Sequence, residues 1–206
     1  MATLNVDASK ILIGGSTSLS SVSQIIQHES LNLTLHTYSN GGFYHELQLE
    51  FVAVEESQKA YLNSVILPNL RANNALRVKL PSNISEYSGS GGVITLDAGT
   101  GAGANVLKIT TPSGLKSDTF IVGEMITIQG QTGIHTISDY NITAGTIQIS
   151  PPINTDATVG LQVATKDIMF EGRPYLSKGK FKTISDPIGA LMKLMIVLRE
   201  TRGSIA

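Results

Sequence analysis

The 206-residue sequence predicts a mainly β (α+β) protein, namely a β-sandwich with one packed helix and an inserted small β-barrel domain. Three observations predict this fold. Apolar and polar residues alternate in several segments, as they do in half-buried strands. Helical spacing is clearest in one segment, which follows Glu55-Glu56. The middle of the chain is rich in Gly, Thr and Ile, and its short strand-like segments are separated by turn residues.

The residue composition and the hydrophobic pattern change after the glycine-rich stretch Ser88-Gly89-Ser90-Gly91-Gly92, which is the strongest boundary signal in the chain. We therefore predict that residues 1–88 and 165–206 form one discontinuous domain, the sandwich with its helix. Residues 89–164 are predicted to form the inserted barrel. Its expected strands are 93–97, 106–111, 125–129, 134–138, 146–150 and 161–165.

The clearest predicted strands lie on either side of Asn40-Gly41-Gly42. A two-residue turn there would pair leucines with polar residues, whereas a three-residue loop makes one face of the hairpin wholly apolar. We expect the second register. Its pairs are Leu35 with Leu47, Leu33 with Leu49, and Leu31 with Phe51.

A helix of about three turns is expected after the two acids, because apolar residues recur there at helical spacing. Pro68 should end or kink it near Leu67, since a proline disfavours helical conformation at the preceding residue. A strand over residues 75–80 follows. Residues 188–198 fit two structures: Asp186-Pro187 could begin a helix, but the evenly apolar run favours a buried strand that completes the first sheet.

Composition narrows the function classes. Charged residues make up 15% of the chain, below the roughly 25% of an average soluble domain. The net charge is −1 and no basic run occurs, so stable nucleic-acid binding is not expected. There is no cysteine, which excludes disulfides and thiolate chemistry. We also expect no secretion signal and no membrane insertion.

The four histidines, His28, His36, His45 and His135, do not predict a metal site. In the chosen register His36 and His45 point to opposite faces of the hairpin, and His36 opposes Glu46. An exposed polar pair explains them without a metal ion.

No catalytic or cofactor-binding constellation is found either, so we do not expect an enzyme. The glycine-rich segments at residues 14–16 and 99–103 lack the spacing of nucleotide-binding loops and are expected to be turns. Ser90 lacks the full turn of a hydrolase nucleophile. The acidic residues considered are Glu55, Glu56, Glu124, Asp139 and Asp156, and none has a setting that predicts acid–base chemistry.

The segment Tyr44-His45-Glu46-Leu47-Gln48-Leu49-Glu50-Phe51, with the helix and strand after it, resembles the sandwich-plus-helix unit of bacteriophage tail-tube and distal tail proteins. Met195-Ile196-Val197-Leu198-Arg199-Glu200 looks like the closing strand of that unit. The central zone, with segments 122–128 and 144–152, is similar to small barrels inserted in phage structural proteins.

The resemblance implies a virion structural protein of the phage tail that forms a homo-oligomeric ring, commonly a hexamer, with tube, hub and fibre proteins as neighbours. The inserted barrel favours a distal tail or baseplate protein at the tail tip over a tail-tube or head-to-tail connector subunit. The resemblance also implies assembly in the host cytoplasm. A carbohydrate- or host-surface-binding module is the alternative of another class.

Overall fold

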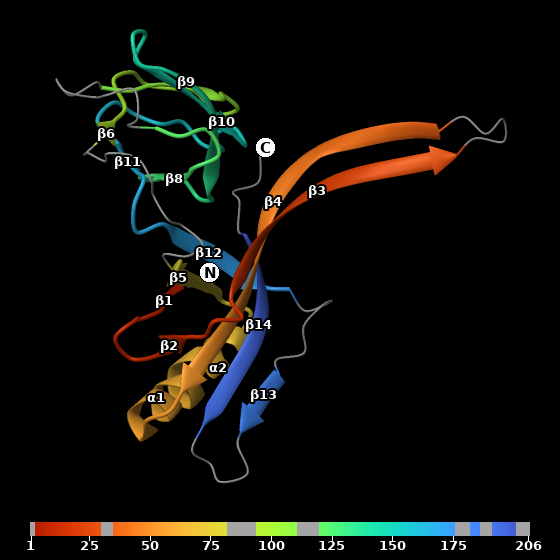
Figure 1. Ribbon diagram of the computed structural model, residues 1–206, viewed down its shortest axis with the longest axis vertical. Helices are drawn as coiled ribbons and strands as arrows, with labels where there is room; N and C mark the ends of the chain where they lie inside the picture. Colours follow the sequence, from red (N-terminus) through yellow and green to blue (C-terminus); the bar gives the residue numbers. More distant parts are fainter. Residues whose placement is uncertain are drawn as a thin grey trace.

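The chain folds into two sheets and one helical segment, which confirms the predicted mainly β fold with one packed helix. The computed structural model describes residues 3–29, 35–81, 94–110, 120–175, 182–185 and 191–200, with the backbone alone for 23–29, 35–43 and 182–185. Figure 1 shows the smaller sheet above the larger one, and the helix against the far end of the larger sheet.

Five strands and all the helical segments of the described chain precede the glycine-rich boundary. They are β1 (Thr3–Asn5), β2 (Leu12–Ile13), β3 (Ser18–Glu29), β4 (Leu35–Ala53), α1 (Glu56–Tyr61), the π-helical turn η1 (Leu62–Ile66), α2 (Leu67–Arg71) and β5 (Ala75–Lys79). The later strands are β6 (Ile94–Thr95), β7 (Val106–Lys108), β8 (Met125–Ile128), β9 (His135–Asn141), β10 (Thr146–Ser150), β11 (Gln162–Ala164), β12 (Met169–Pro174), β13 (Lys182–Ser185) and β14 (Met192–Glu200).

The larger sheet has eight strands in the order β1-β5-β12-β14-β4-β2, with β13 also paired to β14 and β3 also paired to β4. β14 lies inside this sheet, antiparallel to β4 along one edge and to β12 and β13 along the other. The evenly apolar run therefore forms a strand, as favoured from the sequence. Segments before residue 80 and after residue 168 share one sheet.

The core of this sheet follows from the two-residue period of its strands. Alternate residues of β4, among them Leu47, Leu49 and Phe51, are fully buried, and so are Leu194 and Leu198 of β14. Burial of each such side chain contributes about 1.5–3 kcal/mol. The helical segment covers this apolar face with Leu62, Ile66, Leu67 and Leu70.

The helix is longer than predicted, because Pro68 does not end it. The Gln58 side chain accepts a hydrogen bond from the Glu55 N–H at the helix start (3.1 Å). Before the proline the chain widens into η1, and the Leu67 N–H bonds to the carbonyl of Leu62, five residues back. A π turn relieves the clash of a proline ring with the preceding turn, so the helix continues to Arg71.

The predicted hairpin around Asn40-Gly41-Gly42 is wrong. β4 runs through these residues and pairs with β3, so Leu47 lies opposite Leu19 and Leu198 rather than Leu35. Phe51 pairs with Leu194 and Ile13, while Leu31 and Leu33 lie outside the described residues. Ser23 pairs with Phe43 and Ile25 with Ser39, so three residues of β4 oppose one of β3. The glycines mark a bulge, which alternation alone does not distinguish from a turn.

The same register makes the expected pairing of His36 with Glu46 wrong. His36 lies opposite His28, and Glu46 lies between Ser20 and Arg199. Before residue 46, β4 has only β3 as a partner strand within the described chain. Residues 21–29 and 35–45 thus form a two-stranded ribbon, which leaves the body of the molecule in Figure 1.

The smaller sheet contains the six predicted strands of the central zone, in the order β6-β11-β8-β9-β10-β7. Its two end strands meet, because Leu96 forms a bridge with Ile109 and the Thr110 N–H donates to the Thr95 carbonyl (2.8 Å). The sheet is therefore a closed barrel. Its core is separate from that of the large sheet and contains Ile94, Leu96, Leu107, Ile109, Phe120, Ile126, Ile128, Ile137, Ile147, Ile149, Ile153, Ala157 and Val163.

The domain limits at residues 88 and 164 stay a prediction, which a fragment can test. We expect residues 89–164 to fold alone, because the barrel closes its own hydrogen-bond ladder and has its own core. Circular dichroism should show a β spectrum with a cooperative thermal transition, and amide NMR signals should be dispersed. An unfolded fragment would contradict the predicted insertion.

Candidate functional site

The functional residues suggested by the structure lie where the ribbon leaves the large sheet. Here β14 ends beside Tyr44, His45 and Glu46 of β4, and the barrel begins. His45 continues the inward series of β4, and Glu200 continues the inward series of β14. Both side chains are almost completely buried, so the apolar stripe between the strands ends in a polar pair.

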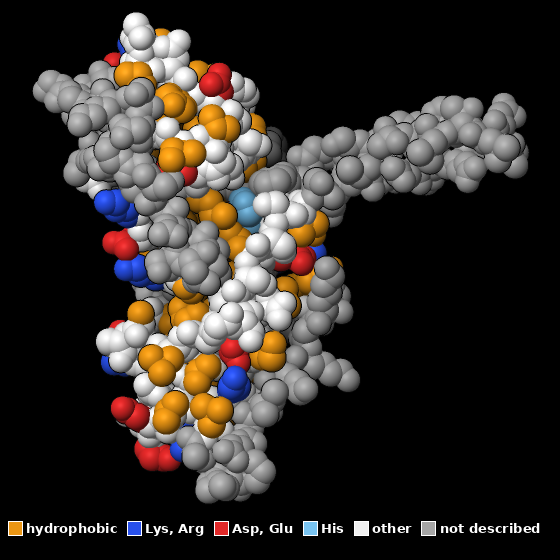
Figure 2. Space-filling view, in the orientation of Figure 1, with side chains coloured by type: hydrophobic (Ala, Val, Ile, Leu, Met, Phe, Trp, Pro, Cys, Tyr) orange, Lys and Arg blue, Asp and Glu red, His pale blue; other side chains and the backbone are white. Residues whose placement is uncertain are grey.

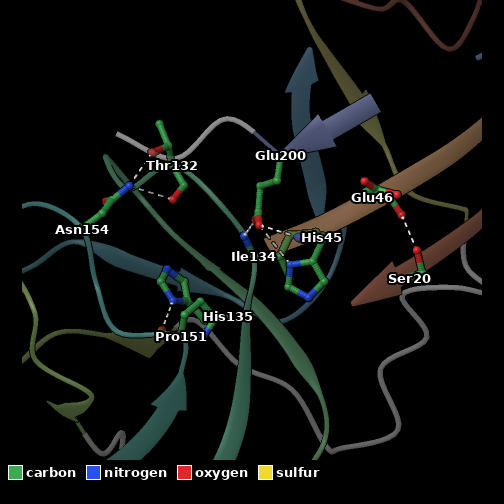
Figure 3. Close-up of polar contacts among 9 residues, drawn as sticks. All are labelled: Ser20, His45, Glu46, Thr132, Ile134, His135, Pro151, Asn154 and Glu200. Carbon is green, nitrogen blue, oxygen red and sulfur yellow. Dashed lines mark hydrogen bonds and ion pairs between the residues drawn. The ribbon is translucent and has the colours of Figure 1, made fainter. Parts of the chain in front are cut away.

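Glu200 connects the barrel to the large sheet. One carboxylate oxygen, Oε1, accepts the Ile134 N–H just before β9 (2.5 Å). The other, Oε2, accepts the His45 N–H and lies 3.1 Å from His45 Nδ1. Figure 3 shows the Glu200 side chain pointing between these two partners. Burial makes each of these bonds matter, because a buried donor without an acceptor costs about 1–3 kcal/mol.

Arg199 occupies the opposite face of β14 at the same point. Its guanidinium lies 3.6 Å from the ring centre of Tyr175 and 4.4 Å from that of Tyr44. The same group bonds to Glu46 Oε1 at 3.1 Å. Stacking on two rings and pairing with a carboxylate fix the planar side chain in place. The ribbon therefore leaves the sheet from a rigid base.

Glu50 forms a second polar contact on this outer face. It is buried, pairs with Lys193 Nζ at 2.9 Å and accepts the Ser16 N–H at 3.2 Å. The hydrogen bond from Lys193 holds the pKa of the Glu50 carboxyl below its usual value, against the opposing effect of burial. A Cβ on Gly14 would overlap the Glu50 side chain, which would then have to move away from its partners. The glycine-rich segment 14–16 is thus a turn that encloses the protein's own carboxylate.

A cavity of about 490 Å³ lies between the barrel and the large sheet. The barrel loop 129–133 lines one side and β5 and β12 the other, with Arg77, Asp167 and Glu171 as its charged residues. Asp167 is paired with Lys79 at 2.7 Å, and Glu171 accepts a hydrogen bond from Thr3 at 3.2 Å. These carboxylates are engaged in structural contacts, and no nucleophile–base pair is found among the described residues of the cavity.

The four histidines do not meet at one place. His28 and His36 are paired on the ribbon, and His45 is at its base. His135 is buried in the barrel, with Nδ1 2.7 Å from the Pro151 carbonyl oxygen. Within the described parts of the chain, no three His, Cys, Asp or Glu side chains gather where they could hold a metal ion.

The remaining candidate residues lie in separate local structures. Glu55 and Glu56 are at the start of α1, and Asp139 accepts the Tyr140 N–H. Segment 99–103 is a turn whose Ala102 N–H bonds to Asp156, and Ser90 lies outside the described residues. Glu124 differs from expectation because it is buried, where it accepts the Ile121 N–H.

Sequence analysis did not identify Glu200 or Arg199 as functional residues. Both follow directly after residues 188–198, which an evenly apolar run predicted as a strand, and their partners are more than 60 residues away in the sequence. The available signal was that two charged residues, Arg199 and Glu200, follow an apolar segment. The sequence alone does not show which distant residues these two side chains contact.

Figure 2 shows one face of the molecule. Apolar side chains are scattered there over both the barrel and the large sheet, with charged side chains between them. Among the described residues, no helix has the length and apolar character needed to cross a bilayer. No protein-family model and no curated protein matches the sequence.

The Glu50 contact predicts a pH-dependent contribution to stability. Because its pKa is lowered on folding, the contribution is complete above the pKa of the unfolded chain and is lost as the pH falls through the folded value. Glu50→Gln should lower the free energy of unfolding by about 1–3 kcal/mol at pH 7. The difference from wild type should shrink below pH about 4.

Urea titrations at pH 7 and pH 3 measure this effect. Glu56→Gln is the matched control, since Glu56 also pairs with a lysine but its side chain is 89% exposed. An equal loss at both pH values, or an equal loss in the control, would contradict the role given to Glu50.

Proposed function

We propose that the chain is a structural subunit of a bacteriophage tail, namely a distal tail or baseplate ring protein that links the tube to tip components. It assembles in the host cytoplasm into a homo-oligomeric ring, commonly a hexamer, and ends in the virion tail. Its further partners are tube, hub and fibre proteins. The proposal rests on the resemblance of the sandwich-plus-helix segments and on one structural feature, the ribbon.

The ribbon carries the proposal because it is difficult to explain in a monomer. Residues 35–45 of β4 pair with β3 alone, so each ribbon strand has an outer edge without a described partner strand. A two-stranded hairpin is marginally stable by itself in water. Exposed strand edges also promote pairing with other chains, and monomers usually protect them. Neighbouring copies in a ring would supply the missing contacts.

The surface composition supports the same proposal. Charged residues are scarce, as they are at the cores of protein interfaces. Several large apolar side chains are exposed on both the large sheet and the barrel. They are Leu12, Val54, Val106, Ile121, Val122 and Val159. Such residues become buried when subunits pack together, and their presence on both units suggests that both contact neighbours.

A tail-tube or head-to-tail connector subunit would share the ribbon and the sheet. The barrel favours the tip, because the plain tube subunit in the resembled family lacks such an insertion. A carbohydrate-binding module has less support. In the barrel Phe120 is buried and packs against Tyr140 with ring centres 6.0 Å apart, so it offers no stacking surface to a sugar.

Shortening the ribbon tests the proposed assembly. Ser23 and Phe43 are paired, so residues 24–42 can be replaced by the two-residue turn Asn-Gly. We expect the wild-type chain to form rings at high concentration and the shortened chain to stay monomeric. Sedimentation velocity and negative-stain imaging measure both states.

The thermal unfolding midpoint is the control. All the described core residues of the large sheet are retained in the shortened chain, so the midpoint should change by no more than a few degrees. Wild-type protein that stays monomeric at every concentration would count against the proposal. So would a shortened chain that still forms rings.

A further inference from the structure

Glu200 is bonded to both structural units through a single carboxylate. Its Oε1 accepts the N–H of Ile134 in the barrel, and its Oε2 accepts the N–H of His45 in the large sheet. The side chain itself belongs to β14 and is completely buried. The carboxylate therefore forms a direct polar bridge between the barrel and the large sheet, each of which has its own main core.

Apolar contacts between the barrel and the large sheet also lie near Glu200. The Ile134 side chain lies in the core of the large sheet, and Met125 of β8 packs against the same core. Beside this contact, the cavity lined by residues 129–133 separates the barrel from β5 and β12. The barrel is thus attached near Glu200 and separated from the sheet along the cavity.

We propose that Glu200 is a positioning residue that acts as a latch and fixes the orientation of the barrel relative to the large sheet. With both bonds formed, the barrel has one orientation. When the bond to Ile134 is lost, the barrel keeps its own fold and moves about the two chain connections. This inference goes beyond assembly and does not depend on it, although in a ring the orientation would decide which neighbour the barrel meets.

The hydrogen bonds of the bridge can be tested with the substitution Glu200→Gln, which changes one acceptor and keeps the size of the side chain. Each carboxylate oxygen accepts a hydrogen bond, whereas an amide of nearly the same shape has one accepting oxygen and one donating nitrogen. In Glu200→Gln the amide oxygen keeps the Oε2 position, where it lies beside both the His45 N–H and His45 Nδ1, so the NH₂ group faces the Ile134 N–H. The barrel then loses its acceptor while the volume of the buried side chain is kept.

The matched control is Glu46→Gln, which removes an acidic partner one strand away. Glu46 pairs with Arg199 within the large sheet and does not touch the barrel through that ion pair. The chain has no cysteine, so two spin labels can be placed without background labelling. Ala60→Cys on the helix and Ser138→Cys on β9 are exposed positions, one in each unit.

Double electron–electron resonance measures the distance between these labels, and hydrogen exchange measures the amides. In wild type and Glu46→Gln we expect one narrow distance distribution. In Glu200→Gln the distribution should broaden or shift. The Ile134 amide should exchange roughly ten- to a hundredfold faster. The amide of Ile147, at the centre of the barrel, should keep its protection.

Three results would overturn the latch. The distance distribution could be unchanged in Glu200→Gln, which would mean that packing alone orients the barrel. The Ile147 amide could lose protection together with Ile134, which would make Glu200 a determinant of barrel folding. Lastly, Glu46→Gln could broaden the distribution as much as Glu200→Gln, which would remove the specificity of the bridge.

Discussion

The whole arrangement depends on the pairing of β14 with strands on both of its sides. β4, β12 and β13 all bond to it, so the large sheet joins segments that flank the barrel in sequence. Its inward side chains, Leu194, Ile196 and Leu198, close the core against β4 and the helix. Without β14, β4 would have only β2 and β3 as partners, and β12 only β5. One strand therefore determines whether the sheet exists as a unit.

The end of β14 also determines how the rest of the molecule is attached. Arg199 fixes the base of the ribbon through two tyrosine rings and Glu46, while Glu200 holds the barrel through Ile134. Two adjacent residues on opposite faces of a strand thus contact two different parts of the molecule, the barrel and the base of the ribbon. In the proposed tail subunit the barrel and the ribbon would meet different neighbours, and a rigid base would set the direction of both.

Much of the fold could be predicted from local pattern. Period-two alternation located the part of β4 after residue 42, short segments between turn residues located the six barrel strands, and an evenly apolar run located most of β14. The pairing partners could not be predicted in the same way. Asn40-Gly41-Gly42 suits a turn or a bulge, and only the presence of β3 as a longer partner decides between them. The helix continues past Pro68 because a π turn before it makes room for the proline ring. The buried residues Leu62 and Ile66 belong to this turn, so its formation depends on their packing. Likewise, the Glu200 contact depends on the placement of a distant segment, and its residue types alone do not reveal it.

Native-state hydrogen exchange on the intact chain tests the central role of β14 most directly, because it compares the opening free energies of individual strands. If β14 holds the large sheet together, the buried amides of β4, β12 and β14 should open together with a single free energy. Those of β8, β9 and β10 should form a second group. If the β14 amides exchanged at a much lower free energy than those of β4 and β12, the sheet would persist without its last strand and the account would be wrong.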